Sequence, residues 1–137
     1  MAVSPLLTVE NESMLEGDFL LNLLVTALEG GSNHWYRFNF GLLKQQKIER
    51  FMVEKDLSTS EGIWAYLSDV ETNHIKVFDF ETGEKVGEFN RQKAIDALTL
   101  VQSEYPRIWK DLQEGSYDAD SADVWFQLAV LDDVVYC

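Results

Sequence analysis

The residues with the clearest potential for chemistry lie between Gly30 and Tyr36, where the sequence reads Gly-Gly-Ser-Asn-His-Trp-Tyr. Polar side chains beside aromatic rings commonly stack on planar ligands or anchor protein partners. Successive free backbone amides at such a turn can also bind an anion. The sequence therefore predicts a ligand- or partner-binding site that borders a pocket rather than lying in the core, formed by Gly31, Ser32, Asn33, His34, Trp35 and Tyr36. The structural alternative is a helix stop followed by a turn, which explains the glycines without a ligand.

A nucleotide-like ligand at this turn would require positive charge close by, because phosphate oxygens pair with basic side chains. The one basic cluster in the chain offers Lys44, Lys47 and Arg50 as phosphate-contacting residues. Catalysis with His34 or His74 as a general base is the least favoured interpretation, so we expect no enzyme. The two histidines lie forty residues apart and the single cysteine is terminal, so we expect no metal and no cofactor.

The net charge of −13 is distributed very unevenly. Residues 1–36 contain five acids and residues 111–137 contain seven, and neither segment has a lysine or an arginine. Such charge argues against direct binding to nucleic acid or to anionic membranes. Solubility alone explains an acidic surface, but the two segments could also meet and present one face to a basic partner. We expect that acidic face to contain Asp118, Asp120, Asp123, Asp132 and Asp133.

Length and composition predict a single domain spanning residues 1–137, with 46% apolar residues available for a core. The only cysteine is Cys137, so no intrachain disulfide can form, which fits a reducing cytoplasm. Neither a secretory signal nor an apolar run of about 20 residues, the length that spans a bilayer, is present. A homodimer is compatible with the sequence.

The pattern of apolar residues predicts an α+β fold, with about four to five helices packed on a small antiparallel sheet that includes a β-hairpin near 74–89. Apolar spacing predicts a helix over 13–29, opened by a capping box at Ser13 and closed by left-handed glycines at Gly30 and Gly31. The other expected elements are strands over 3–9 and 34–40, helices over 58–69, 90–104, 106–115 and 120–131, and a strand-like end at 134–136, while 41–56 is ambiguous.

Helix-start and helix-stop residues support several of these boundaries. Ser58 and Asn90 are good N-terminal caps, and Pro106 suits a first helical turn. Gly115 ends the helix that Pro106 begins. Asp120 to Asp123 are expected to cap the last helix.

Two stretches resemble a family of small, mostly uncharacterised phage and prophage proteins. They are the Ala-Leu-Glu-Gly-Gly-Ser-Asn turn that starts at Ala27 and the Ala-Asp-Val-aromatic helix that starts at Ala122. The chain departs from that family at His34, where an aromatic residue is usual, and at Cys137, where glycine is usual. The resemblance implies a viral accessory protein, and such proteins often inhibit host defences.

Two functions follow as hypotheses. The first is a non-enzymatic phage protein that binds and inhibits a host defence component of the CRISPR or restriction type, by presenting an acidic face that imitates nucleic acid to a basic host protein. The second is a small-ligand binder that sequesters a nucleotide-like signalling molecule at the turn from Gly30 to Tyr36. The charge distribution favours the first, and the glycine–polar–aromatic turn favours the second.

Overall fold

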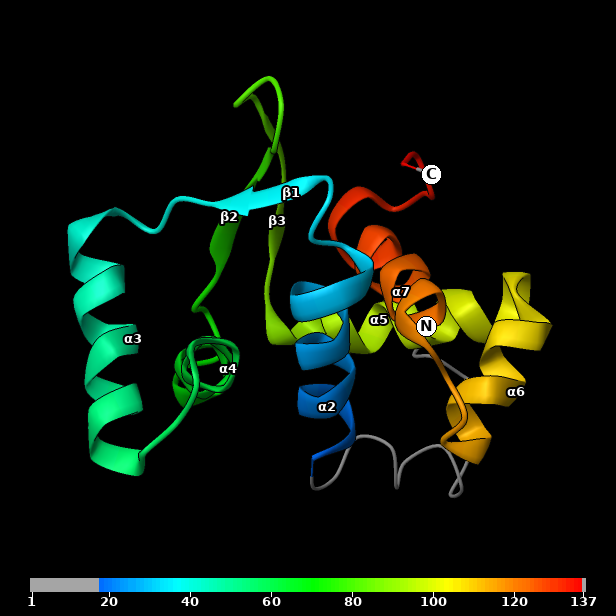
Figure 1. Cartoon of the computed structure of the whole chain (residues 1–137), viewed down its shortest axis with the longest axis horizontal. Coiled ribbons are helices and arrows are strands. Elements are labelled where there is room, and N and C mark those ends of the chain that lie inside the picture. Colours follow the sequence, from blue (N-terminus) through cyan, green and yellow to red (C-terminus); the bar gives the residue numbers. More distant parts are fainter. Residues whose placement is uncertain (1–17, 137) are drawn as a thin grey trace.

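Six α-helices and three strands form the described part of the chain, residues 18–136 of the computed structural model (Figure 1). In order they are α2 (Phe19–Thr26), a π-helical turn η2 (Ala27–Gly31), β1 (Tyr36–Phe38), α3 (Gly41–Lys55), α4 (Thr59–Asp69), β2 (Ile75–Asp79), β3 (Lys85–Phe89), α5 (Arg91–Glu104), α6 (Pro106–Glu114) and α7 (Ala119–Leu131). The α+β prediction is confirmed, and the ambiguous segment 41–56 is helix α3. The expected strand over 3–9 and the capping box at Ser13 lie outside the described residues.

The sheet is antiparallel with the order β1-β2-β3, so β2 is its central strand. The expected hairpin is β2–β3, and its turn is held by Asp79. One carboxylate oxygen of Asp79 accepts hydrogen bonds from the backbone amides of Glu81 and Thr82, both at 2.8 Å. Gly83 follows with a φ of +75°, a conformation that glycine adopts without a steric penalty.

Most predicted helix boundaries are confirmed by hydrogen bonds. Ser58 and Glu61 form a reciprocal capping box at α4, and Asn90 accepts from the Lys93 amide at α5. The last helix begins earlier than expected, because the side chain of Asp118 rather than that of Asp120 accepts from the Ser121 amide. Residues 134–136 pair with no strand in the described structure, so the expected strand-like end is wrong.

The helix that precedes the turn does not end on left-handed glycines. Its last residues widen into η2, where the amide of Ser32 donates to the carbonyl oxygen of Ala27, five residues earlier. Neither Gly30 nor Gly31 has a positive φ, so that prediction is wrong. Gly31 is needed for a close approach instead: a Cβ there would stand 1.9 Å from the carbonyl oxygen of Ala119 on α7.

The core is centred on α7, which packs against α2, η2, α5 and β3. Trp125 and Phe126 of α7 are fully buried, and the indole nitrogen of Trp125 donates to the carbonyl oxygen of Ala94 on α5. The helices therefore bury one continuous apolar cluster, in which Leu24 and Leu98 are also inaccessible.

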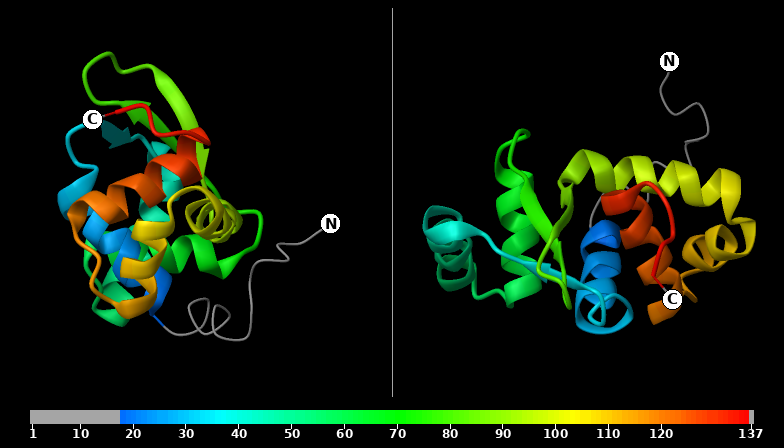
Figure 2. Two further views of the ribbon diagram at one scale, coloured as in Figure 1. Left: turned by 90° about the vertical axis from the view of Figure 1, so that its right-hand side faces the viewer. Right: turned by 90° about the horizontal axis from the view of Figure 1, so that it is seen from above.

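Helices α3 and α4 form one end of the molecule and α6 lies at the other (Figures 1 and 2). α3 packs on α4, and Ile48 is its only buried residue. Its other large apolar side chains are half-buried or, at Leu42, Leu43 and Val53, largely exposed. Within residues 18–136, no helix has the length and apolar character that crossing a membrane requires.

Candidate functional site

The turn from Gly30 to Tyr36 is tied to α7 by the carboxylate of Asp123. One oxygen of this carboxylate accepts hydrogen bonds from the hydroxyl of Ser32 at 2.6 Å and from the indole nitrogen of Trp35 at 2.8 Å. The other oxygen accepts from the side-chain nitrogen of Gln127 at 2.9 Å. All four residues are buried. A buried carboxylate with three donors is stable because each donor replaces a lost hydrogen bond to water.

Gln127 extends this network to the end of the chain. Its side-chain oxygen accepts from the backbone amides of Val135 and Tyr136, both at 2.8 Å, and its nitrogen also donates to the carbonyl oxygen of Tyr136. The Tyr136 ring stacks on Trp35, with centroids 4.8 Å apart and planes 9° from parallel. The Tyr136 hydroxyl donates to Asp79 at 2.6 Å, which raises the pKa of Tyr136 to about 12. The network therefore joins the turn, α7, the C-terminal segment and the hairpin.

These contacts change the interpretation of the predicted binding residues. Trp35 is only 2% exposed and Ser32 is inaccessible, so the expectation that Trp35 lies outside the core is wrong. Gly31 packs against the carbonyl oxygen of Ala119 at the start of α7. The hydroxyl of Tyr36 donates to the carbonyl oxygen of Leu28, and burial followed by the charge of Glu29 raises the pKa of Tyr36 to about 12.

Asn33 and His34 are the two predicted residues whose side chains face solvent. His34 lines a shallow cavity of about 210 Å³ together with the edge of Trp35, Asp79 and Tyr136. Below about 300 Å³ a cavity is small for a drug-sized ligand. The turn is therefore mainly a structural junction that leaves two polar side chains at the surface.

The predicted acidic face is divided by the fold. Asp123 is buried in the network, so its place on an exposed face is wrong. Asp118 is exposed but caps α7. Asp132 and Asp133 follow the other end of α7, a helix of 13 residues that is therefore about 20 Å long at the usual rise per residue. Asp118 and Asp120 thus form one exposed group and Asp132 and Asp133 another.

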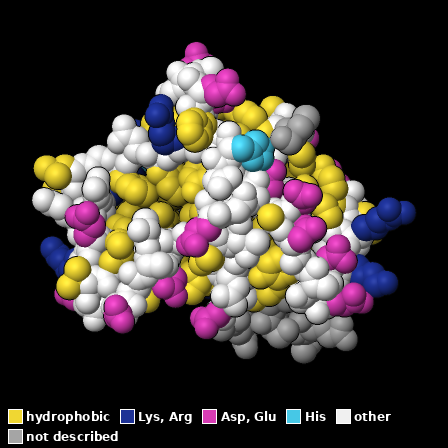
Figure 3. Space-filling model, in the orientation of Figure 1, with side chains coloured by type: hydrophobic (Ala, Val, Ile, Leu, Met, Phe, Trp, Pro, Cys, Tyr) yellow, Lys and Arg dark blue, Asp and Glu magenta, His cyan; other side chains and the backbone are white. Residues whose placement is uncertain are grey.

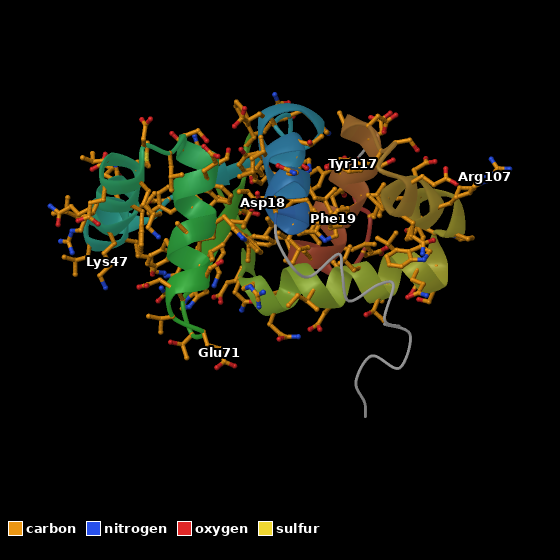
Figure 4. All side chains as sticks on the ribbon, turned by 90° about the horizontal axis from the view of Figure 1, so that it is seen from below. Asp18, Phe19, Lys47, Glu71, Arg107 and Tyr117 are labelled. Atoms are coloured by element: carbon orange, nitrogen blue, oxygen red, sulfur yellow. The ribbon has the colours of Figure 1, made fainter. Side chains whose placement is uncertain are left out.

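The two acid-rich segments nevertheless meet around α2 and α7. Phe19, next to Asp18, contacts the ring of Tyr117 edge-on at 6.1 Å, and Tyr117 precedes Asp118. Figure 4 shows Asp18, Phe19 and Tyr117 close together on the underside of the molecule. We call the exposed carboxylates of the two chain segments that this contact joins the acidic surface, and it consists of Asp18, Glu114, Asp118 and Asp120.

The predicted phosphate-contacting residues lie on α3, and they separate into two groups. The ammonium group of Lys44 donates to the carbonyl oxygen of His74 at 2.8 Å, and burial, followed by the charge of Lys76, lowers the pKa of Lys44. Lys47 and Arg50 instead line a cleft of about 380 Å³ that includes no residue of the turn. The structure therefore does not supply the nearby basic cluster that would have strengthened the hypothesis of a nucleotide-like ligand at the turn.

We call this cavity the α3–α4 cleft. One wall is a single face of α3, and the other is the end of α4 with the residues that follow it. Its lining residues are Lys47, Arg50, Phe51 and Glu54 on the first wall and Tyr66, Asp69, Val70 and Asn73 on the second. The spacing of residues 47, 50, 51 and 54 is that of one helix face, so the first wall of the cleft could be predicted from the sequence. The sequence analysis did not identify the second wall.

A second hollow lies on the opposite flank of α3. Figure 3 shows hydrophobic side chains gathered in a depression between α3 and α2, below β1. A cavity of about 360 Å³ in this region is lined by Phe38, Phe40, Ile48 and Met52, with polar residues at its margin. α3 therefore stands between two cavities, which explains why only Ile48 is buried on it.

Among residues 18–136, no group of three or more histidine, cysteine or acidic side chains is placed to hold a metal ion. No family model, no curated protein and no solved structure matches this chain. The resemblance to phage proteins therefore stays a prediction.

Proposed function

We propose that this chain is a non-enzymatic, phage-encoded accessory protein that acts in the host cytoplasm, where it binds a basic surface of a host defence protein and inhibits it. The resemblance of the turn and of the last helix to phage proteins motivates the viral assignment. Imitation of nucleic acid by the acidic surface is the mechanism that we favour.

The observation that carries this proposal is the meeting of two segments that contain acids and no bases. Phe19 of α2, which follows Asp18, contacts Tyr117, which precedes Asp118, although the two rings are almost a hundred residues apart in the chain. Carboxylates that share a surface add their potentials and attract a basic partner. In Figure 3 acidic side chains are spread over the face, whereas most basic ones lie near its edges.

The test uses purified host nucleases of the CRISPR and restriction types, with cleavage of plasmid DNA as the readout. We expect inhibition of at least one nuclease, and inhibition should weaken steeply with salt because exposed charges are screened beyond about 8 Å at 0.15 M ionic strength. Inhibition that is independent of salt, or no inhibition of any nuclease in the panel, would contradict the proposal.

The variant that removes the acidic surface combines Asp18→Asn, Asp118→Asn and Asp120→Asn. Asparagine at position 118 retains the cap of α7 while it removes the charge. We expect inhibition to weaken at least tenfold, which is about 1.4 kcal/mol. A matched control neutralises three other exposed acids, Glu71, Glu84 and Glu104, and should inhibit like the wild type.

A further inference from the structure

The α3–α4 cleft contains charged groups of both signs that form no ion pair with another residue in the described part of the chain. Lys47 and Arg50 carry positive charge, and Glu54 and Asp69 carry negative charge. Within the described residues, the ion pairs closer than 4 Å are His74–Glu88 and Lys85–Glu88, so none of these four takes part in one. With a volume of about 380 Å³, the cleft falls in the size range of small-molecule sites.

The hydroxyl of Tyr66 gives the cleft a second, independent feature of a binding site. Tyr66 is 4% exposed, yet its hydroxyl makes no hydrogen bond to any described residue. No fully buried side-chain nitrogen or oxygen in residues 18–136 lacks a partner, so this hydroxyl must reach the surface in the cleft that Tyr66 lines. The ring of Tyr66 is buried while its hydroxyl is accessible, so this hydroxyl can donate a hydrogen bond to a ligand in the cleft.

The rest of the lining indicates the kind of ligand. The ring of Phe51 and the side chain of Val70 provide an apolar surface between the charged groups. The side-chain nitrogen of Asn73 donates to the carbonyl oxygen of Tyr66 at 2.8 Å, which fixes the loop after α4 as a wall.

We propose that the α3–α4 cleft binds a zwitterionic small molecule of the amino-acid class with an apolar side chain. Its carboxylate would pair with Lys47 and Arg50, and its ammonium group with Glu54 and Asp69. The two signs of charge in the lining cancel, which suits a ligand without net charge. A nucleotide fits less well, because its phosphate charge would meet two carboxylates in a protein whose net charge is already −13.

The experiment compares L-phenylalanine with two analogues that each lack one charge, by following backbone amide resonances of the whole chain in nuclear magnetic resonance titrations. The analogue 3-phenylpropanoate lacks the ammonium group, and 2-phenylethylamine lacks the carboxylate. We expect L-phenylalanine to shift the resonances of residues 47–54 and 66–73 saturably and each analogue to bind at least tenfold more weakly. Equal binding of an analogue, or no saturable shift with L-phenylalanine, would overturn the proposal.

Three conservative variants test which group of the ligand each cleft residue contacts. Arg50→Gln should weaken binding of L-phenylalanine at least fivefold and leave 2-phenylethylamine unaffected, whereas Asp69→Asn should leave 3-phenylpropanoate unaffected. Tyr66→Phe keeps the packed ring and should weaken L-phenylalanine at least threefold without lowering Tm. The control Arg91→Gln removes a positive charge outside the cleft and should bind normally.

Titrations with adenosine monophosphate and inorganic phosphate complete the design. If either shifts the same resonances at lower concentration than L-phenylalanine, the cleft is an anion site and the zwitterion proposal is wrong. No residue of the acidic surface lines the cleft, so this outcome is independent of the nuclease assays.

Discussion

Replacement of Asp123 tests most directly whether the turn at Gly30–Tyr36 is structural. In Asp123→Ala, the hydroxyl of Ser32 and the indole nitrogen of Trp35 lose their common acceptor while both stay buried. Each orphaned donor costs about 1–3 kcal/mol, so the variant should lose about 2–6 kcal/mol. Since a domain is stable by only about 5–15 kcal/mol, this loss would remove a substantial fraction of the free energy of unfolding.

Asp123→Asn is the sharper variant, because it changes shape very little. If the asparagine amide nitrogen faces Gln127, it meets the side-chain nitrogen of Gln127, a second donor. Gln127 cannot turn its oxygen to help, because that oxygen accepts from the amides of Val135 and Tyr136. If the amide nitrogen faces Trp35 instead, it meets the indole N–H. Either orientation leaves a donor unpaired, so we expect a loss of about 1–3 kcal/mol.

The assay is urea unfolding followed by tryptophan fluorescence and checked by circular dichroism. Asp120→Asn is the control, because Asp120 is exposed and a surface substitution of this kind usually changes stability by less than about 0.5 kcal/mol. If Asp123→Asn also stays within about 0.5 kcal/mol of the wild type, the network is not what holds the turn, and its residues would again be available for a ligand.

Three further outcomes follow from the structure. Gly31→Ala places a Cβ 1.9 Å from the carbonyl oxygen of Ala119 and should lower the free energy of unfolding by at least about 1–3 kcal/mol. Gly30→Ala is the control, because the nearest neighbour of its Cβ lies at 3.7 Å, and it should leave Tm nearly unchanged in a thermal unfolding assay of both variants. The pKa of Tyr136 in the folded protein is about 12, against an ordinary 10.0. The hydrogen bond of its hydroxyl therefore contributes fully to the free energy of unfolding below pH 10, and this contribution is lost between about pH 10 and 12. Tyr136→Phe should flatten that part of a curve of stability against pH. Hydrogen bonds from the Tyr136 hydroxyl and then from the hairpin amides hold the pKa of Asp79 below its ordinary 3.8. The ionised carboxylate therefore contributes to the free energy of unfolding above that pH, and this contribution is lost as the pH falls further. Asp79→Asn should remove this acid dependence of stability.

Local signals predicted most of the fold, because helix caps and the hairpin depend on residues close in sequence. Ser58 and Asn90 satisfy amides three residues away, so their patterns are visible in the sequence alone. The segment from Gly41 to Lys55 was ambiguous because few of its residues are buried, which leaves a weak apolar period. The end of α2 was mispredicted because Gly31 serves contact with α7, a neighbour that is distant in sequence.

The candidate site was harder to predict, because polarity alone does not reveal whether a group already has a partner. Ser32 and Trp35 were expected to meet a ligand, but Asp123, about ninety residues later, accepts both of their hydrogen bonds. Tyr66 was not predicted as a binding residue, because a tyrosine at helical spacing usually belongs to a core. Only the three-dimensional arrangement shows that the polar groups of the turn already have partners, whereas the charged groups of the α3–α4 cleft form no ion pair with a described residue.

Some acidic side chains already stabilise the fold, and this decides which variants can test the acidic-surface proposal. Of the acids in the last segment, Asp123 holds the turn and Asp118 caps α7, so both stabilise the fold whatever the partner. A charge reversal that included Asp123 would bury an unpaired lysine, a mechanism of severe destabilisation. Binding would then be lost through unfolding, and the result would support nucleic-acid mimicry for the wrong reason. Variants that neutralise Asp18, Asp118 and Asp120 and keep Asp123 isolate the electrostatic contribution, because they change exposed charge and retain both the cap and the network.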